Sequence, residues 1–357
     1  MTKKNIFLIK FENREKFVTK THFKIWIAEC YSCQIDVIEL LKQSSLAPFL
    51  TIFCSHTRLR PELQTGADYF FQQPKLEQSA NWLLEQCQQH QIDLVFCGKK
   101  GEIFEQYRSV FEQNQIQLVT GTLGLNAHAQ INHKFQFTEK CQQFNLPVIP
   151  AQFAVDAQSL KAGIAAYQKQ YSRICVKPVH GVYGLGFAEL IDDLSYFRHF
   201  QQPDVCNTQQ FIQAYQQQEK PPAYLVMPFI AGQECSVDVA CHRGQVLALV
   251  TRVKFDFYQQ CYTEHECHSI AKKLVDVFQC DGLINIQFRQ DEQQNWHILE
   301  INPRPAGAFA YTQHTGINLV ATLIAHKLNL PNQTSTVIQP NVRVLPMIKS
   351  KVIDQNI

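Results

Sequence analysis

The first third of the chain alternates short apolar runs with longer amphipathic segments. The apolar runs, which we interpret as strands, stand at 25–27, 50–53, 94–97 and 116–120. The segments between them, which we interpret as helices, stand at 37–41, 79–90 and 103–111. Strands that alternate with helices predict a parallel sheet with crossover helices, so we expect an α/β lobe at the start of the chain.

A second pattern, with a period of two, runs through residues 285–304, which read NIQFRQDEQQNWHILEINPR. The polar stretch 290–295 predicts a turn. The flanking runs should therefore pair as an antiparallel hairpin that brings Gln287 beside Glu300. Unbroken alternation places four apolar side chains on one face, namely Ile286, Phe288, Leu299 and Ile301.

The opposite face of this hairpin carries oxygen and guanidinium chemistry. Its residues are Asn285, Gln287, Glu300, Asn302 and Arg304. Carboxylate and amide oxygens suit Mg²⁺, which proteins usually share with substrate phosphates, and an arginine fork suits an anionic group. A hairpin with a solvated polar face would show the same alternation, so this segment alone leaves both interpretations open.

A lysine and a glycine-rich turn follow one another earlier in the chain. The apolar run 173–178 contains Lys177, and the residues 180–186 after it read HGVYGLG. Glycines let backbone N–H groups approach anionic oxygens, and a lysine ammonium supplies a point charge for the same group. The turn lacks the Gly-Lys-Ser/Thr ending of a Walker loop and the helix of a dinucleotide fingerprint.

A third segment, residues 224–239, reads YLVMPFIAGQECSVDV and predicts a strand, a break and a second strand. In this order and spacing, the three segments resemble the ATP-grasp superfamily. The likeness is greatest to the group of carbamoyl phosphate synthetase, biotin carboxylase and D-alanyl ligase. It covers about residues 26–330.

The resemblance implies an α/β fold in which a Rossmann-like pre-ATP-grasp lobe precedes a two-lobed ATP-grasp α+β domain. The implied boundaries are 1–125 for the first lobe, 126–226 for the lid lobe with its lysine and glycine-rich loop, and 227–357 for the C-terminal lobe with the metal site. The stretch 195–222 has the character of an insertion in the lid lobe, and its role is not legible from the sequence.

The resemblance also assigns residues to ATP. Two lysines would contact the phosphates, a loop would close over them, a linker backbone would bind the adenine edge and an acid would bind the ribose. Those residues are, in that order, Lys134 and Lys177; His180, Gly181, Gly184 and Gly186; Pro228 and Ile230; and Glu234. Met227 stands where family members often carry an acid, which removes one adenine contact and leaves the nucleotide preference open.

Metal and catalytic roles follow from the same resemblance. Two Mg²⁺ ions, for which Mn²⁺ substitutes, would bind three hairpin residues, Gln287, Glu300 and Asn302. Lys177 would act in catalysis, while Asn285 and Arg304 would face the transferred phosphoryl group and the acyl phosphate. Arg252 and Lys254, on alternate positions of a strand, are candidates to hold an acceptor carboxylate.

The activity implied is that of an ATP-dependent ligase that joins a small carboxylate to an amine or a thiol through an acyl phosphate. It would release ADP and phosphate. The alternatives are a catalytically silent ATP-binding regulator or partner subunit, a biotin-carboxylase-like enzyme, and a kinase. A biotin-attachment lysine between methionines is not found in the chain, whose only methionines are 1, 227 and 347.

Composition fits a globular enzyme with a large core. The 357 residues are 45% hydrophobic and 18% charged, and the net charge of +2 comes from interspersed positive and negative residues, so we expect no nucleic-acid partner. We expect no membrane partner either, because the apolar stretch near the N-terminus ends at Ile9, too short for a signal peptide. Thirteen cysteines are then best interpreted as reduced thiols of a cytoplasmic protein. A homodimer is the assembly we consider for this protein.

Two groups of cysteine and histidine need an explanation of their own. Cys30 and Cys33 form a CxxC spacing without a second pair, so we expect their turn to border the substrate cleft and to have no redox role. A second group comprises Cys261, His265, Cys267 and His268, whose spacing matches no structural zinc pattern, and we expect a helix to start there, over 269–278.

Overall fold

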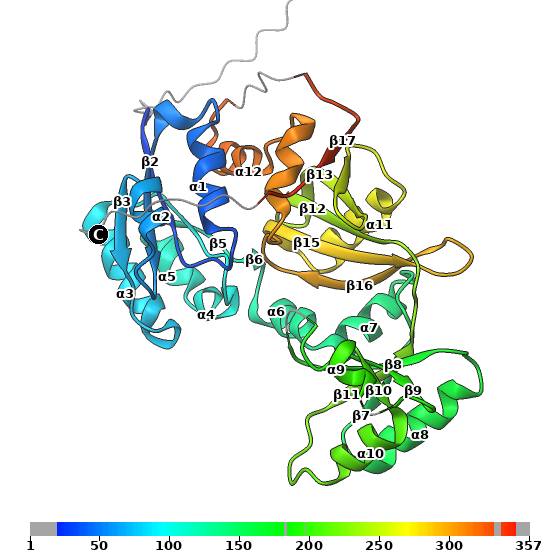
Figure 1. Cartoon of the computed structure of the whole chain (residues 1–357). Coiled ribbons are helices and arrows are strands. Elements are labelled where there is room, and N and C mark those ends of the chain that lie inside the picture. Colours follow the sequence, from blue (N-terminus) through cyan, green and yellow to red (C-terminus); the bar gives the residue numbers. More distant parts are fainter. Residues whose placement is uncertain (1–19, 182–183, 196, 332–336, 348–357) are drawn as a thin grey trace, which may run out of the picture.

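The computed structural model describes residues 20–181, 184–195, 197–331 and 337–347 (Figure 1). The N-terminal segment 1–10 and the tail 348–357 lie outside the described residues, as do residues 182 and 183 of the glycine-rich turn. None of the helices described is long and apolar enough to cross a membrane.

The first lobe is a parallel sheet flanked by helices, as the alternating pattern predicted (Figure 1). Its strands, in spatial order, are β3 (Tyr69–Gln72), β2 (Leu50–His56), β1 (Phe23–Ile27), β4 (Leu94–Phe96) and β5 (Gln117–Val119). Its helical elements are α1 (Gln34–Lys42), η1 (Ala47–Phe49), α2 (Pro61–Gly66), α3 (Leu76–His90), α4 (Gly101–Glu105) and α5 (Arg108–Gln113). The single helix expected at 103–111 is thus two short helices. The edge strand β3 went unpredicted because no position in it is fully buried and its pattern does not alternate.

The lid lobe contains a mixed sheet with helices against it. Its strands, in spatial order, are β10 (Val205–Asn207), β9 (Ala188–Ile191), β8 (Ile174–Pro178), β11 (Tyr224–Pro228) and β7 (Gln152–Ala154). Its helices are α8 (Ala157–Gln168), α9 (Arg198–Gln201) and α10 (Thr208–Gln216). The stretch 195–222 therefore supplies an edge strand and α10, whose Ile212 and Tyr215 complete the lid core.

The C-terminal lobe is built on a largely antiparallel sheet. Its strands, in spatial order, are β16 (Trp296–Asn302), β15 (Cys280–Gln290), β12 (Glu234–His242), β13 (Gln245–Lys254), β14 (Gln259–Tyr262) and β17 (Asn341–Val344), and β6 (Gly121–Thr122) also pairs with β15. Its helical elements are α6 (Leu125–Asn132), α7 (Lys134–Gln143), α11 (Cys267–Val277), η2 (Phe309–Thr315) and α12 (Leu319–Leu328). Residues of α6, α7 and α11 share one core cluster with the sheet, so the two helices that lead into the lid rest on this lobe.

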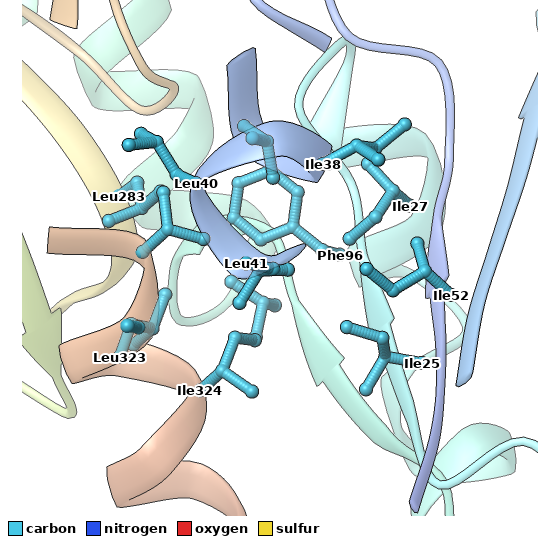
Figure 2. Close-up of a cluster of buried hydrophobic side chains, with 14 of the residues drawn as sticks. Ile25, Ile27, Ile38, Leu40, Leu41, Ile52, Phe96, Leu283, Leu323 and Ile324 are labelled. Atoms are coloured by element: carbon cyan, nitrogen blue, oxygen red, sulfur yellow. The ribbon is translucent and has the colours of Figure 1, made fainter. Parts of the chain in front are cut away.

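A shared hydrophobic core joins the first and last lobes (Figure 2). Leu40 and Leu41 of α1 pack with Leu323 and Ile324 of α12 and with Leu283 of β15. Burial of side chains of this size stabilises such a junction by about 1.5–3 kcal/mol each. The junction holds the carboxyl ends of β1 and β4 near the end of the β15–β16 hairpin, where one cavity is lined by residues from both lobes.

Candidate nucleotide and acceptor site

A slot with mostly apolar walls lies between the lid sheet and the C-terminal sheet. It is a cavity of about 230 Å³. Its apolar lining residues include Ile149, Cys175, Leu225, Met227, Phe229 and Ile298. Pro228 and Ile230, predicted to offer backbone groups to adenine, also line the slot, because the linker between β11 and β12 crosses its end. Its mostly apolar walls suit a purine base.

Lys134 and Lys177, which the resemblance assigns to the phosphates of ATP, both line this slot. The Lys134 ammonium donates to the carbonyl of Gly181 at 2.8 Å, and that of Lys177 donates to the Glu300 carboxylate, also at 2.8 Å. Burial lowers the pKa of Lys134, and the positive charge of Lys177 lowers it further. The structure therefore gathers two cations at the mouth of an apolar slot.

The described part of the glycine-rich turn has a backbone that favours glycine. Gly184 and Gly186 have positive φ angles of 69° and 77°. A Cβ atom on Gly186 would also stand only 2.6 Å from the Pro178 ring. The Nδ1 atom of His180 lies 3.1 Å from the carbonyl oxygen of Asn132, to which it donates a hydrogen bond. The turn is thus tied at its start to the junction of α6 and α7.

The hairpin pairs as predicted, with Gln287 opposite Glu300. A β-bulge follows this pair, so that Phe288 faces Ile298 and the alternation breaks at Leu299. Leu299 lines the slot beside Glu300, and our prediction that it shares the buried face with Ile301 is wrong. A bulge inserts an extra residue, which shifts the following side chains to the other face.

Glu300 lies between cations and stays ionised. Burial acts to raise its pKa, but Lys177, Lys134 and Asn302 together outweigh burial, and the pKa lies below the usual range. The Asn302 amide donates to the other carboxylate oxygen at 3.4 Å. Gln287 lines the slot from the neighbouring strand. The three predicted metal ligands therefore present oxygen atoms on one sheet face.

Asn285 lies deeper than these residues, in a buried network. Its amide donates to Asp238 at 2.9 Å, and Asp238 also accepts from the Arg252 guanidinium at 2.5 Å. Within the described part of the chain, the Asn285 Oδ1 atom is buried and has no hydrogen-bond partner. Arg252 is only 2% exposed, so it orders the interior of the sheet and is not open to an acceptor. The prediction overlooked Asp238, although it alternates with Glu234 and Ser236 on β12.

Glu234 forms ion pairs with Lys254 and with Arg289. Burial opposes its ionisation, but the two cations outweigh this effect and lower the pKa of the carboxyl group. Glu234 and Lys254 do not line the slot, whereas Arg289 does, and Arg289 donates to the carbonyl of Ile230 at 3.3 Å. Arg289 is a functional candidate that our sequence reasoning missed, although its alternation with Gln287 on one strand was visible.

A second cavity, of about 410 Å³, adjoins the slot and shares Lys134, Gly181 and Glu300 with it. The first lobe contributes Tyr31, Gly98, Lys100 and Glu102 to this cavity, and the end of the hairpin contributes Asn302 and Arg304. The Arg304 guanidinium lies 4.4 Å from the centre of the Tyr31 ring, a cation–π contact. His180 also lines the cavity.

The CxxC turn borders this cavity through Tyr31, while the thiols of Cys30 and Cys33 are buried. Burial raises the pKa of Cys33 to about 12, so the thiol is unreactive. The second group, Cys261, His265, Cys267 and His268, does not form one cluster in the structure. Cys261 donates to the carbonyl of Tyr311 and His268 contacts Thr251, whereas His265 and Cys267 lie together at the start of α11.

Structural comparison finds the same architecture in known enzymes. The biotin carboxylase of Campylobacter jejuni, solved with an ATP analogue, has a TM-score of 0.64 and 16% identity over 89% of this chain and 74% of its own. The biotin carboxylase domain of the Hydrogenobacter thermophilus 2-oxoglutarate carboxylase, solved with MgADP and bicarbonate, has a TM-score of 0.62 and 15% identity, over 85% of this chain and 69% of its own. The N5-carboxyaminoimidazole synthetase of Staphylococcus aureus, solved with ADP, has a TM-score of 0.62 and 14% identity, over 90% of this chain and 81% of its own.

The chain therefore has the ATP-grasp fold, and the resemblance predicted from its sequence motifs is confirmed. Within this fold, residues 220–350 match the model of a family described as ATP-grasp in the biosynthetic pathway with Ter operon. None of the curated protein sequences matches the chain.

Proposed function

We propose that the protein is an ATP-dependent ligase that activates a small carboxylate as an acyl phosphate and passes the acyl group to an amine or a thiol. The observation that carries this proposal is that the apolar slot and the second cavity meet at Lys134, Gly181 and Glu300. A nucleotide in the slot would present its terminal phosphate at this junction, and a carboxylate in the second cavity would lie next to it.

The slot fits ATP by its chemistry. Apolar walls suit the base, and the backbone of the linker offers hydrogen bonds at its edge. Lys134 and Lys177 suit the phosphates, as do backbone N–H groups of the glycine-rich turn. Glu234 is held ionised behind Arg289, and we propose that this pair contacts the ribose.

The oxygen donors fit Mg²⁺. Gln287, Glu300 and Asn302 offer amide and carboxylate oxygens, the ligands that hard divalent cations prefer. Lys177 now occupies one Glu300 oxygen, and it would leave that oxygen for a phosphate when the metal and nucleotide bind. Bound metal ions would neutralise phosphate charge as the phosphoryl group is transferred.

The second cavity suits an anionic acceptor. Lys100, Lys134 and Arg304 line it, against the carboxylates of Glu102 and Glu300. Lys100 lies 3.5 Å from Glu102, an exposed pair that is weak enough to exchange partners. With Glu300 committed to metal, a positive surface faces the substrate carboxylate, and Arg304 would hold the transferred group.

The proposed reaction has two steps. A carboxylate oxygen of the acceptor attacks the γ-phosphorus, and the bond to the β,γ-bridging oxygen breaks to release ADP. An amine or thiol then attacks the acyl carbon, displaces inorganic phosphate and loses its proton. The glycine-rich turn would cover the junction and exclude water, which would otherwise hydrolyse the acyl phosphate.

The test is turnover of ATP by the purified chain with Mg²⁺ and pools of carboxylates, amines and thiols. ADP formation, with a new condensed mass in the product mixture, would establish ligation and name both substrates. A bicarbonate-only pool tests the carboxylase alternative, since two of the similar structures are biotin carboxylases. Tight Mg-ATP binding without turnover in every pool would overturn the ligase proposal in favour of a regulator.

A further inference from the structure

Two thiols and an imidazole meet on the face of the C-terminal sheet that lies away from the nucleotide slot. Cys235 stands on β12, Cys267 is the first residue of α11, and His265 lies just before that helix. Cys235 pairs with Phe288, whereas the next residue on its strand pairs with Gln287, which lines the slot. Because side chains alternate along a strand, the cluster and the slot lie on opposite faces.

The spacing of the three groups suits one metal ion. The two sulfur atoms stand 3.7 Å apart, and a His265 ring nitrogen and both sulfurs all lie within 4.8 Å of one another. Two thiolates bound at about 2.3 Å to one tetrahedral Zn²⁺ stand roughly 3.8 Å apart. Two thiols in simple contact would stand at a similar distance, so the imidazole beside them is what distinguishes a binding site from core packing.

The cluster also has an entrance. Both thiols are buried, whereas His265 is partly exposed and lies edge-on to Trp296 at 5.3 Å between ring centres. The His265 Nδ1 atom accepts a long hydrogen bond, of 3.3 Å, from the backbone N–H of Cys267. Such a bond is weak enough for a metal ion to replace. Because His265 is partly exposed, solvent reaches this side of the cluster, from which a water molecule could complete the coordination.

The pKa of Cys267 is shifted in the opposite direction from that of the other cysteines. The Cys235 thiol donates toward the Cys267 sulfur and lowers the pKa of Cys267 to about 7; burial acts against this shift and His265 supports it. Burial raises the pKa of the twelve other cysteines, Cys235 included. The eleven cysteines outside the cluster act as small apolar residues. The distances among the two sulfur atoms and the imidazole, and not this pKa, point to a metal ion.

We propose that Cys235, His265 and Cys267 bind one Zn²⁺ ion, with water as the fourth ligand, and that the ion fastens the start of α11 to β12. The site lies behind the sheet, so its role is to hold the fold of the C-terminal lobe. Zinc favours four-coordinate sites of cysteine and histidine, which matches this set of donors. The sequence prediction missed the site because Cys235 is 32 positions away from Cys267.

The experiment uses the full chain, stripped with a chelator and titrated with Zn²⁺ in competition with a chromophoric chelator. We expect one ion per chain and a melting temperature that rises by a few degrees, since a ligand that binds only the folded state stabilises it. Co²⁺ in place of Zn²⁺ should give thiolate-to-metal charge-transfer absorption, which reports cysteine ligands directly.

Two variants and a matched control decide the assignment. Cys267→Ser and His265→Gln should each weaken Zn²⁺ binding by at least 10- to 100-fold, the loss seen when even a residue that supports a ligand is removed. Cys261→Ser, which alters another buried thiol of the same sheet, should bind as the unmodified chain does. His265 is partly exposed, so its variant should fold even where Cys267→Ser does not. Absence of binding, binding unaffected by His265→Gln, or a chain two hydrogens lighter from a Cys235–Cys267 disulfide would each overturn the proposal.

Discussion

Two carboxylates of the C-terminal lobe, Asp281 and Glu300, both pair with a lysine, but their surroundings differ. Asp281 accepts two bonds from Lys327, at 2.8 and 2.9 Å, and further bonds from His242 and from the backbone N–H of Arg243. Its side chain is 1% exposed and that of Lys327 is 5% exposed. The Asp281 pair lines a cavity of about 420 Å³, but it is almost closed to solvent and supplied with several partners, and we call it the sealed pair.

Glu300 and its lysine partner, Lys177, instead line an open cavity. It holds Lys177 by one bond at 2.8 Å and accepts a longer bond, at 3.4 Å, from Asn302. The side chains of Lys177 and Glu300 are 19% and 24% exposed. A pair with open positions can exchange its partners for a metal ion and a phosphate, while a sealed pair cannot. Both carboxylates form an ion pair, so the ion pair alone does not identify a binding site. The difference is how many hydrogen-bond positions of the carboxylate are still open to a ligand.

The largest effect on stability is expected from breaking the sealed pair. Asp281→Asn leaves the Lys327 ammonium buried without its counter-charge, which should lower the free energy of unfolding by about 3–5 kcal/mol. Denaturant unfolding measures this loss. ATP turnover per folded molecule should stay within about twofold, because neither residue lines the slot. A loss below about 1 kcal/mol would contradict the structural role.

A double variant and the pH dependence provide the controls. Asp281→Asn with Lys327→Met removes both charges and should recover part of the lost stability. Burial opposes ionisation of Asp281, but Lys327 outweighs it and lowers the pKa of the carboxyl group. The stabilisation is therefore complete above the unfolded pKa of about 3.9 and is lost as the pH falls toward the folded value. The stability difference between the unmodified chain and Asp281→Asn should narrow below about pH 4.

For the open pair of Lys177 and Glu300, we expect a large effect on ATP turnover and a small effect on stability. Glu300→Gln removes the charge that the proposed metal needs and should lower ATP turnover by at least about 100-fold, or roughly 2.7 kcal/mol of transition-state stabilisation. The free energy of unfolding should change by less than about 1 kcal/mol, because Lys177 can turn to solvent. Steady-state ADP release and denaturant unfolding on the same preparation separate the two effects.

Glu189→Gln is the matched control for this variant. Glu189 also pairs with a cation, through two bonds from Arg173 at 2.6 and 2.8 Å, but it lines neither the slot nor the second cavity. Its removal should leave turnover per folded molecule within about threefold. Equal losses in the Glu189 and Glu300 variants would show that any ion pair of the domain limits activity, and the site assignment would fail.

The same contrast explains how much the sequence could predict. Local patterns were sufficient for the parallel sheet and for the hairpin that pairs Gln287 with Glu300. Each of these depends on a period of two or 3.6 within one segment. The partners Asp281 and Lys327 lie 46 positions apart, and their meeting depends on how α12 packs on the sheet. No pattern within a single segment contains that information.

The β-bulge after Gln287 is the clearest case in which a local sequence pattern predicts the wrong side-chain direction. One extra residue reverses the side-chain alternation, and nothing in the letters HILE announces it. The consequence is functional, because three successive residues, Ile298, Leu299 and Glu300, all line the slot. An apolar wall and a metal ligand thus come from neighbouring positions on one strand.

The smallest predicted effect tests this bulge. Leu299→Ala removes apolar surface from the slot and should raise the KM for ATP by about 10-fold, equivalent to about 1.4 kcal/mol, with little change in kcat. Ile286→Ala, on the paired strand β15, removes a side chain that is 0% exposed, belongs to the core and does not line the slot. It should instead cost about 2–5 kcal/mol of stability and leave the KM nearly unchanged. Unbroken alternation places Ile286 and Leu299 on the same buried face, so equal effects of the two variants on the KM and on unfolding would contradict the bulge.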